Sequence, residues 1–344
     1  HKRDLRRANL GAWLLWRNLS GYNDLLKLIV QFGYTRKFEL DYTLPPMGRQ
    51  RKFGFNINAL FSDNKEIAFD TEANKLQFYN NYVDSERQFQ RIRGRFRLYY
   101  RRTLFETQKL EISYLQLKIS DTAARLNPDF FSGGQTKQQS FNIQYTYSLD
   151  RRDIQAYPLN GYFVSARIAK RGLGIFNDLN QLEIGTKIGY YKSLGPWLSV
   201  GSTLNAQYNF NRKKQAYYNN KALGYWDDFV RGYQYYVIDG QDYFCLNSDL
   251  NFKILDVKIP LIKKPKMTYL NVLPLRIHLR YHLDVGYVWD QHYQGLNPLS
   301  NSDLWGTGIG LDFILYSYNV ILQIDYSWNK NGDTGLYFSY KFNF

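Results

Sequence analysis

The sequence predicts an all-β protein, a transmembrane antiparallel β-barrel of about sixteen strands. Three observations favour this fold class. The mean hydropathy is polar, at −0.50, although 18% of the residues are aromatic. No apolar run reaches the length of about 18 residues that a transmembrane helix needs. Long segments alternate between apolar and polar residues, as strands do between lipid and a wet lumen.

The clearest alternation is "LRIHLRYHLDVGYVWD", residues 275–290. Its odd positions are apolar from Leu275 to Trp289, whereas its even positions include arginines, histidines and aspartates. A soluble β-sandwich can show the same pattern, but this strand is longer than the usual soluble strand. The pattern also recurs along the chain, which favours a barrel. It recurs at 141–149, 198–210, 244–254 and 318–328.

Applied to the whole chain, the pattern gives an even number of strands, as bacterial barrels require. The barrel is expected to close, because an open sheet edge in lipid leaves backbone groups unpaired. Alternation is weakest at 8–18, 64–80 and 160–170. The sixteen predicted strands are 8–18, 23–34, 35–44, 51–62, 64–80, 87–101, 104–119, 138–149, 160–170, 179–193, 195–210, 241–256, 274–290, 303–314, 316–328 and 333–344.

The predicted connections alternate in length if the first strand starts on the periplasmic side. Longer connections at 120–137, 211–240 and 291–302 then lie outside, as outer loops do. Most connections on the other side are short. No linker or shift in composition indicates a second domain, so residues 1–344 are predicted to form one barrel domain.

The chain carries a formal charge of +15, which suits either nucleic acid or anionic lipid headgroups. The alternation favours the membrane, so the expected partners include outer-membrane lipids and lipopolysaccharide, and no nucleic acid. The single cysteine, Cys245, excludes an internal disulfide framework.

Several motifs carry a family resemblance. "FVRGY" (229–233) lies between the eleventh and twelfth predicted strands, and "DRRDIQAYPLNGYFV" (150–164) between the eighth and ninth. "LDVGYVWD" (283–290) and "GTGIGLDF" (306–313) lie in the next strands, and the chain ends "GLYFSYKFNF". Together they resemble the barrel domain of the BamA/TamA superfamily of outer-membrane assembly and translocation proteins, the bacterial surface antigen family. The motifs cover 140–344; the first eight strands match by topology.

The resemblance implies a sixteen-stranded barrel whose sixth outer loop folds into the lumen. The loop-tip motif here is Val230, Arg231, Gly232 and Tyr233. Arg231 is expected to contact Asp284 in the thirteenth strand, with His282 where relatives often have an aromatic residue. The alternation independently puts Asp284 on the lumen side, where a guanidinium–carboxylate pair gains more than on an exposed surface. Gly232 permits a sharp turn at the tip.

Both ends of the chain bear on closure. The last strand has an apolar face ending in Tyr340, Phe342 and Phe344; with Gly335 it resembles the C-terminal signal by which barrels are recognised, and it is equally a plain lipid face. Segment 8–18 is apolar on both faces, so its register is weakly specified. This is compatible with a labile seam or with an irregular barrel entrance.

A basic ladder occupies one face of the strand at 87–101. One hypothesis is that Asp227, Asp228 and Asp239 of the folded-in loop neutralise part of it; the other is a generic basic pore lining. The ladder residues are Arg91, Arg93, Arg95, Arg97 and Arg101.

No catalytic or metal site is predicted. His278 and His282 stand four residues apart on a strand, which separates them by about 13 Å, too far for shared ligation. The sequence therefore predicts no enzyme activity and no cofactor.

The resemblance implies a factor that inserts or translocates polypeptides through a lateral seam between the first and last strands. It would act in the outer membrane of a Gram-negative bacterium on nascent outer-membrane proteins, together with periplasmic or outer-membrane accessory subunits. The alternatives are a passive or single-substrate secretion pore and a TamA-like factor in lipid transport. The family's periplasmic POTRA modules are expected upstream of the barrel and are absent from this chain.

Overall fold

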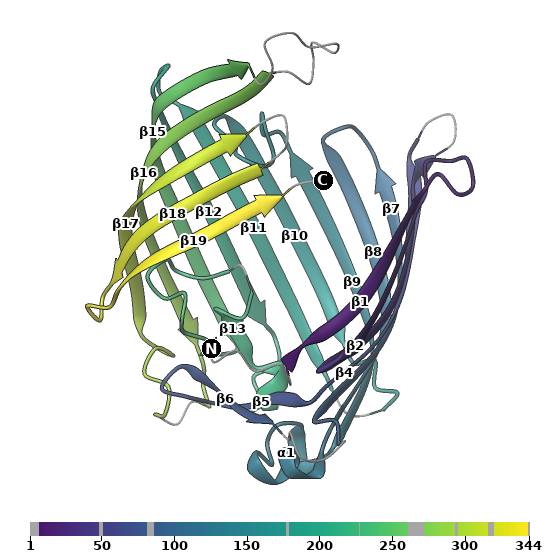
Figure 1. Cartoon of the computed structure of the whole chain (residues 1–344). Coiled ribbons are helices and arrows are strands. Elements are labelled where there is room, and N and C mark those ends of the chain that lie inside the picture. The colour runs from purple at the N-terminus through teal and green to yellow at the C-terminus, as the bar shows by residue number, and fades with distance from the viewer. Residues whose placement is uncertain are drawn as a thin grey trace.

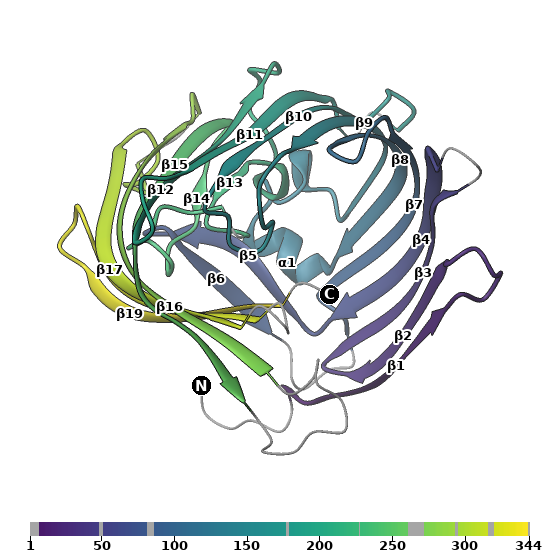
Figure 2. The ribbon, with the colours of Figure 1, turned by 90° about the horizontal axis from the view of Figure 1, so that it is seen from above.

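The chain folds into a tall, curved wall of tilted antiparallel strands (Figure 1). In this computed structural model the described residues are 7–47, 51–80, 86–176, 179–226, 228–260, 272–292, 295–315 and 320–342. Fifteen strands form one sheet in the order β1-β2-β3-β4-β7-β8-β9-β10-β11-β12-β15-β16-β17-β18-β19. Seen from above, this wall curves into an incomplete ring (Figure 2).

The wall strands are β1 (Asn9–Arg17), β2 (Leu25–Gly33), β3 (Thr35–Met47), β4 (Phe53–Asn64), β7 (Phe89–Arg101), β8 (Glu106–Ile119), β9 (Lys137–Asp150), β10 (Gly161–Arg171), β11 (Gln181–Ser193), β12 (Leu198–Asn209), β15 (Asp242–Pro260), β16 (Val272–Trp289), β17 (Asp303–Leu315), β18 (Val320–Asn329) and β19 (Thr334–Phe342). The elements outside the wall are β5 (Glu66–Glu72), β6 (Lys75–Asn80), α1 (Asp121–Leu126), β13 (Lys221–Leu223), β14 (Ile238–Asp239) and the 3-10 turns Ser132–Gly134 and Tyr217–Asn219.

The two faces of the wall invert the usual burial of a soluble protein. On β16, Leu279, Tyr281 and Leu283 are exposed. The residues between them, Arg280 and His282, are buried. An apolar outer face and a polar inner face are what a barrel in lipid requires, so the predicted fold class is confirmed. No helix within the described residues is long and apolar enough to cross a bilayer.

One predicted wall strand is wrong. Of the predicted strand 64–80, residues 66–80 form a separate hairpin, β5–β6, which is a two-stranded sheet of its own, and β4 pairs directly with β7. The chain reverses at Ala73 and Asn74, both with positive φ. Two successive residues of that conformation make a tight hairpin turn, which the sequence hides because no glycine marks it. The remaining fifteen predicted strands each correspond to one wall strand.

The wall has fifteen strands where sixteen were predicted, and this odd number affects how the barrel can close. Every neighbouring pair is antiparallel, so β1 and β19, the first and fifteenth strands, run in the same direction. Within the described residues β1 pairs only with β2 and β19 only with β18, and the sheet does not close. The long connections 120–136, 210–241 and 290–302 share one end of the wall, as predicted. With one strand fewer, however, β1 starts at that long-connection end, not at the opposite one.

The long-connection end is covered from inside. Hairpin β5–β6 and helix α1 lie across it (Figures 1 and 2). Asn74 ties the hairpin to other connections, because its side chain donates to the Val237 carbonyl and accepts from the Leu299 backbone N–H. An apolar cluster that includes Ile67, Phe130 and Phe131 holds the hairpin and helix region against the wall.

Candidate functional site

The connection between β12 and β15, residues 210–241, is called the inserted loop. Its short strands β13 and β14 pair with each other and lie inside the ring of wall strands (Figure 2). Leu223, Val230 and Tyr233 of the loop pack with Cys245 and Val288 of the wall in one buried cluster. The loop is therefore seated by an apolar core before any charge interaction is considered.

Arg231 at the loop tip forms a two-pronged ion pair with Asp284 of β16. Its Nε donates to Asp284 Oδ2 at 2.7 Å and its Nη2 to Oδ1 at 2.6 Å, while its backbone N–H also donates to Oδ2 at 3.0 Å. Asp284 is fully buried. Asn247 adds a donor at 2.7 Å, so the carboxylate has several partners. This geometry is the strong, orientation-specific form of a guanidinium–carboxylate contact.

A second carboxylate completes the anchor. Arg231 Nη1 lies 2.5 Å from Asp249 Oδ1 of β15. Burial alone would lower the pKa of the Arg231 guanidinium, but Asp249 and Asp284 outweigh it, so this pKa is raised above its ordinary value. The guanidinium is therefore a permanent charge whose neutralisation depends on these two wall residues.

Glycines of the wall make room for the tip. A Cβ at Gly306 of β17 would stand 1.7 Å from the Arg231 carbonyl oxygen, and one at Gly286 of β16 would stand 2.7 Å from Val230 Cγ2. Gly232 itself has φ +95°, a conformation that glycine adopts at little cost. Its carbonyl accepts from Asn329 Nδ2 at 2.8 Å. The glycine-containing segments of β16 and β17 thus form the seat of the tip.

A chain of charges connects the inserted loop to residues 151–160, a loop at the opposite end of the wall. Arg280 of β16 lies 4.0 Å from Asp249 and 3.1 Å from Asp312. Tyr157 donates its hydroxyl to Asp312 Oδ2 at 2.7 Å, and the same oxygen lies 3.2 Å from Asn251 Oδ1. Two loops from opposite ends of the barrel therefore contact one polar network on β15–β17.

Comparison with known proteins identifies the family. Residues 18–344 match the Omp85 superfamily domain. The chain belongs to the Omp85 superfamily. Omp85 proteins are outer-membrane β-barrels that act on substrate proteins there. The resemblance stated from the motifs is confirmed at this level.

Solved structures show the same Omp85 fold. BamA from Haemophilus ducreyi lacking POTRA domains 1–3 matches with a TM-score of 0.62 and 14% identity, over 97% of this chain and 67% of that one. CdiB from Escherichia coli matches at 0.58 and 13%, over 96% and 58%. CdiB from Acinetobacter baumannii matches at 0.56 and 13%, over 96% and 55%. This chain thus spans 55–67% of their lengths. No curated protein matches the sequence itself.

His282 lies beside the tip of this Omp85 barrel without a hydrogen bond to it among the described contacts. Its Nε2 is 3.2 Å from the Ser327 hydroxyl, and its ring fills the space above Gly308. The wall residues Asp249, Gly306 and Arg280 were missed at the sequence level. The polar-face alternation puts Asp249 and Arg280 in the lumen, but no pattern in the sequence tells which residue of a distant loop they face.

The hypothesis that loop acids neutralise the arginine ladder is wrong for the two acids that are described. Asp228 lies 3.6 Å from Lys187, and Asp239 accepts from Tyr225. Asp227 lies outside the described residues. The ladder's acids come instead from other wall strands. Glu111 lies opposite Arg97 on the neighbouring β8, whereas Glu39 and Asp41 lie on β3, one strand beyond β4. Arg93 pairs with Glu39, Arg95 with Asp41, and Arg97 with Glu111. Within the described part of the chain, Arg91 and Arg101 pair with no carboxylate.

At the C-terminal end, Tyr340 is exposed on the outer face of β19. Gly335 leaves space for the Tyr337 side chain, whose hydroxyl oxygen would stand 2.5 Å from a Cβ there. Phe342 ends β19 opposite Val320, and Phe344 lies outside the described residues.

Tyr157→Phe tests the second loop contact. The change removes a hydrogen bond to the fully buried Asp312 carboxylate, and bonds to charged groups contribute about 1.5–3 kcal/mol. We expect the free energy of unfolding to fall by that amount in urea titrations. Tyr162→Phe, an exposed tyrosine on the adjoining β10, is the control and should change little. Equal effects of both changes would contradict the assigned bond.

A buried acid–base pair joins the two short strands of the inserted loop. Lys221 of β13 is the cross-strand partner of Asp239 of β14. Burial raises the pKa of Asp239 to about 6, against hydrogen bonds from Tyr225 and Thr71 and the charge of Lys221. Burial likewise lowers the pKa of Lys221 to about 8, with Asp239 opposing the shift. The two groups are therefore charged at the same time only between about pH 6 and pH 8.

This pair predicts a pH dependence. Because the folded pKa of Asp239 is raised, its contribution to stability is full below about pH 4 and is lost as the pH rises through 6. A difference of about two pKa units corresponds to on the order of 3 kcal/mol. Asp239→Asn should remove this loss. We expect urea titrations to show that the free energy of unfolding decreases less between pH 4.5 and pH 7 in the variant than in the wild type. An identical decrease in both would refute the assignment.

Proposed function

We propose that this Omp85 barrel is an outer-membrane assembly and translocation factor that acts through a lateral seam between β1 and β19. The observation that carries the proposal is the pair of open edges. Neither strand has a second partner among the described residues, and unpaired edges offer backbone donors and acceptors to an incoming strand. A substrate strand would be templated on such an edge by β-augmentation.

The first edge is suited to exchange. All nine residues of β1 are exposed, on both faces, whereas the neighbouring strands have at least one partly buried face. Side-chain packing therefore contributes little to holding β1 in place, and its attachment depends on the ladder of hydrogen bonds to β2. A strand attached by one ladder alone separates more readily than one packed on both sides.

The inserted loop contacts the second open edge, at β19. The Tyr235 ring packs against Tyr337 of β19, with the ring centroids 5.5 Å apart. Tyr236 donates its hydroxyl to Asp333, just before β19, at 2.8 Å. Opening at β19 would therefore disturb the loop that Arg231 anchors. In this proposal the loop is a plug coupled to the seam.

The proposed activity has no chemical step and uses no cofactor. The barrel would lie in the outer membrane of a Gram-negative bacterium, in contact with outer-membrane lipids and lipopolysaccharide. Its substrates would be nascent outer-membrane proteins. Periplasmic or outer-membrane accessory subunits would assist the barrel. Within the described residues, no three His, Cys, Asp or Glu side chains are grouped as a metal site would need.

Cross-linking across the seam tests this proposal. Cysteine pairs would be placed along β1 and β19 in a Cys245→Ser background and joined with a bifunctional thiol reagent whose spacer contains a reducible disulfide. We expect joined pairs to stop insertion of a reporter barrel into proteoliposomes, and reduction to restore it. The matched control joins positions 309 and 326, which already face each other on β17 and β18, and should leave insertion intact. Unimpaired insertion with a joined seam would refute the lateral route.

A pore is the second candidate function. The row of lumenal arginines on β7 would favour passage of anions through an open lumen. The same joined-seam variants discriminate between the two functions, because a pore keeps its conductance when the seam is closed.

A further inference from the structure

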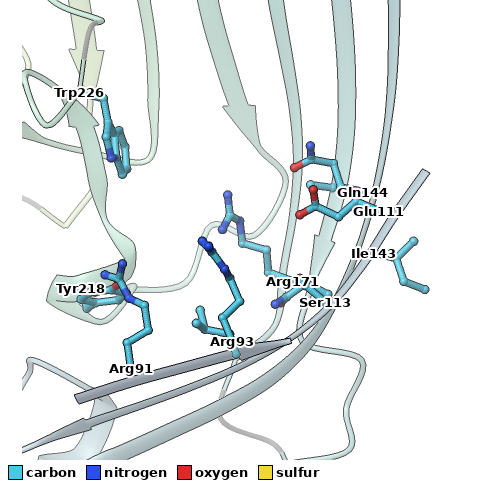
Figure 3. Close-up of a pocket in the computed structure, with 12 residues that line it drawn as sticks. Arg91, Arg93, Glu111, Ser113, Ile143, Gln144, Arg171, Tyr218 and Trp226 are labelled. Carbon is cyan, nitrogen blue, oxygen red and sulfur yellow. The ribbon is translucent and has the colours of Figure 1, made fainter. Parts of the chain in front are cut away.

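A basic pocket lies in the lumenal wall, apart from the loop tip. It encloses about 260 Å³ and is lined from strands β7 to β10. Arg91 and Arg93 of β7 and Arg171 of β10 enter it from the wall (Figure 3). Tyr218 and Trp226 of the inserted loop form its other side. Figure 3 shows the Arg93 and Arg171 side chains extending into the same space.

The acids around the pocket are already shared between cations. Glu111, the one acidic residue of the lining, pairs with Arg97. Glu183 pairs with both Arg167 and Arg171. In the same way Glu39 lies 2.6 Å from Lys37 and 3.8 Å from Arg93. Positive charge in the pocket therefore exceeds the negative charge available to neutralise it.

Arg91 is the least neutralised of the three. Its Nη2 donates to the Tyr218 hydroxyl at 3.1 Å, and among the described residues no carboxylate forms an ion pair with it. A guanidinium has five N–H donors in a fixed fork, so most of those of Arg91 remain for water or a ligand. The phenol to which it is bonded belongs to the inserted loop, so the donor is held in position.

The lining also supplies neutral donors. Ser113, Asn142 and Gln144 border the same space. Guanidinium forks and small polar groups around one cavity suit an oxyanion with several acceptor oxygens. Three converging positive charges favour a multiply charged anion over a single carboxylate. Trp226 is 68% exposed and offers an aromatic face at the mouth.

We propose that this pocket binds an oxyanion of the phosphate class, either a free polyphosphate or phosphate ester, or the headgroup of an anionic phospholipid. The proposal is independent of the lateral-seam function, because it rests on the pocket alone.

Calorimetric titration with inorganic tripolyphosphate tests the site, using the purified barrel in a neutral detergent at low ionic strength. We expect saturable binding by the wild type and about tenfold weaker binding by Arg91→Gln, the loss that corresponds to one charge-assisted contact. Arg101→Gln is the matched control: Arg101 shares the strand and face, carries the same charge and lies outside the lining. It should weaken binding less than about twofold, since it contributes only long-range attraction.

Two further arms identify the source of the phosphate. Phosphatidic acid in nanodiscs should compete with tripolyphosphate if the ligand is a headgroup, and should not compete if it is free. Should Arg91→Gln fail to fold, Arg91→Lys keeps the charge and loses the fork, and binding should still weaken. The proposal is overturned if no saturable binding occurs, if Arg101→Gln weakens binding as much as Arg91→Gln, or if oligoglutamate binds more tightly than tripolyphosphate.

Discussion

Replacement of Arg231 by alanine is expected to release the tip of the inserted loop while the barrel remains folded. The change leaves Asp284 charged and fully buried, with only Asn247 and backbone donors near it. Removing one partner of a buried ion pair costs about 3–5 kcal/mol. Hydrogen exchange of the loop amides measures this directly, since their opening free energy should fall by that amount while the amides of β8 to β11 are unchanged.

The matched control for Arg231→Ala is Lys214→Ala in the same loop. Lys214 also pairs with an aspartate, Asp129, but their side chains are 58% and 61% exposed. Exposed pairs contribute at most about 1 kcal/mol, so this change should leave loop exchange nearly as it is. If both variants lose protection equally, the buried pair has no special part in holding the loop.

Gly306→Ala is expected to displace the same tip from the opposite side. The added Cβ would lie 1.7 Å from the Arg231 carbonyl oxygen, so either the tip or β17 must move. Overpacking of this kind typically costs 1–3 kcal/mol. Because β17 is held on both sides by ladders to β16 and β18, we expect the tip to move. Limited proteolysis should then cut the inserted loop sooner than in the wild type.

Gly94→Ala controls for the loss of a wall glycine. Gly94 lies on β7, and a Cβ there would have no atom within 4 Å. This variant should keep wild-type protease resistance. If Gly306→Ala keeps it as well, the close approach of the tip to β17 is not a constraint on the loop.

Most of the wall could be predicted from the sequence because lipid and lumen impose an alternation on every strand. Asp284 illustrates this, since its even position on the strand at 274–290 was enough to turn it inward. The pattern failed at 64–80, where a turn at Ala73 and Asn74 folds the segment on itself. Alternation is weak in this segment, but no glycine marks the two-residue turn, so the predicted strand count is one too high.

The site could be predicted only in part. The motif resemblance paired Arg231 with Asp284, and the structure brings the two together. The resemblance did not indicate that Arg231 also pairs with Asp249, or that Tyr157 donates to Asp312. Those contacts depend on how far each loop reaches across the lumen, which is set by the three-dimensional path of the loop. Local periodicity contains no information on such paths.

The partners of the arginine ladder show the same limit. Arg97 meets Glu111 because β7 and β8 pair in the register that puts these residues opposite each other. The sequence shows both residues but not the register. The sequence therefore points to the loop for acids that in fact lie on β8 and β3.

A double-mutant cycle on Arg231 and Asp284 tests the anchoring of the inserted loop most directly. Hydrogen exchange would give the opening free energy of the loop in the wild type, Arg231→Ala, Asp284→Ala and the double variant. We predict a coupling energy of about 2 kcal/mol or more, because the charges are buried and share two hydrogen bonds. A coupling energy near zero, with the two single effects simply additive, would contradict the account.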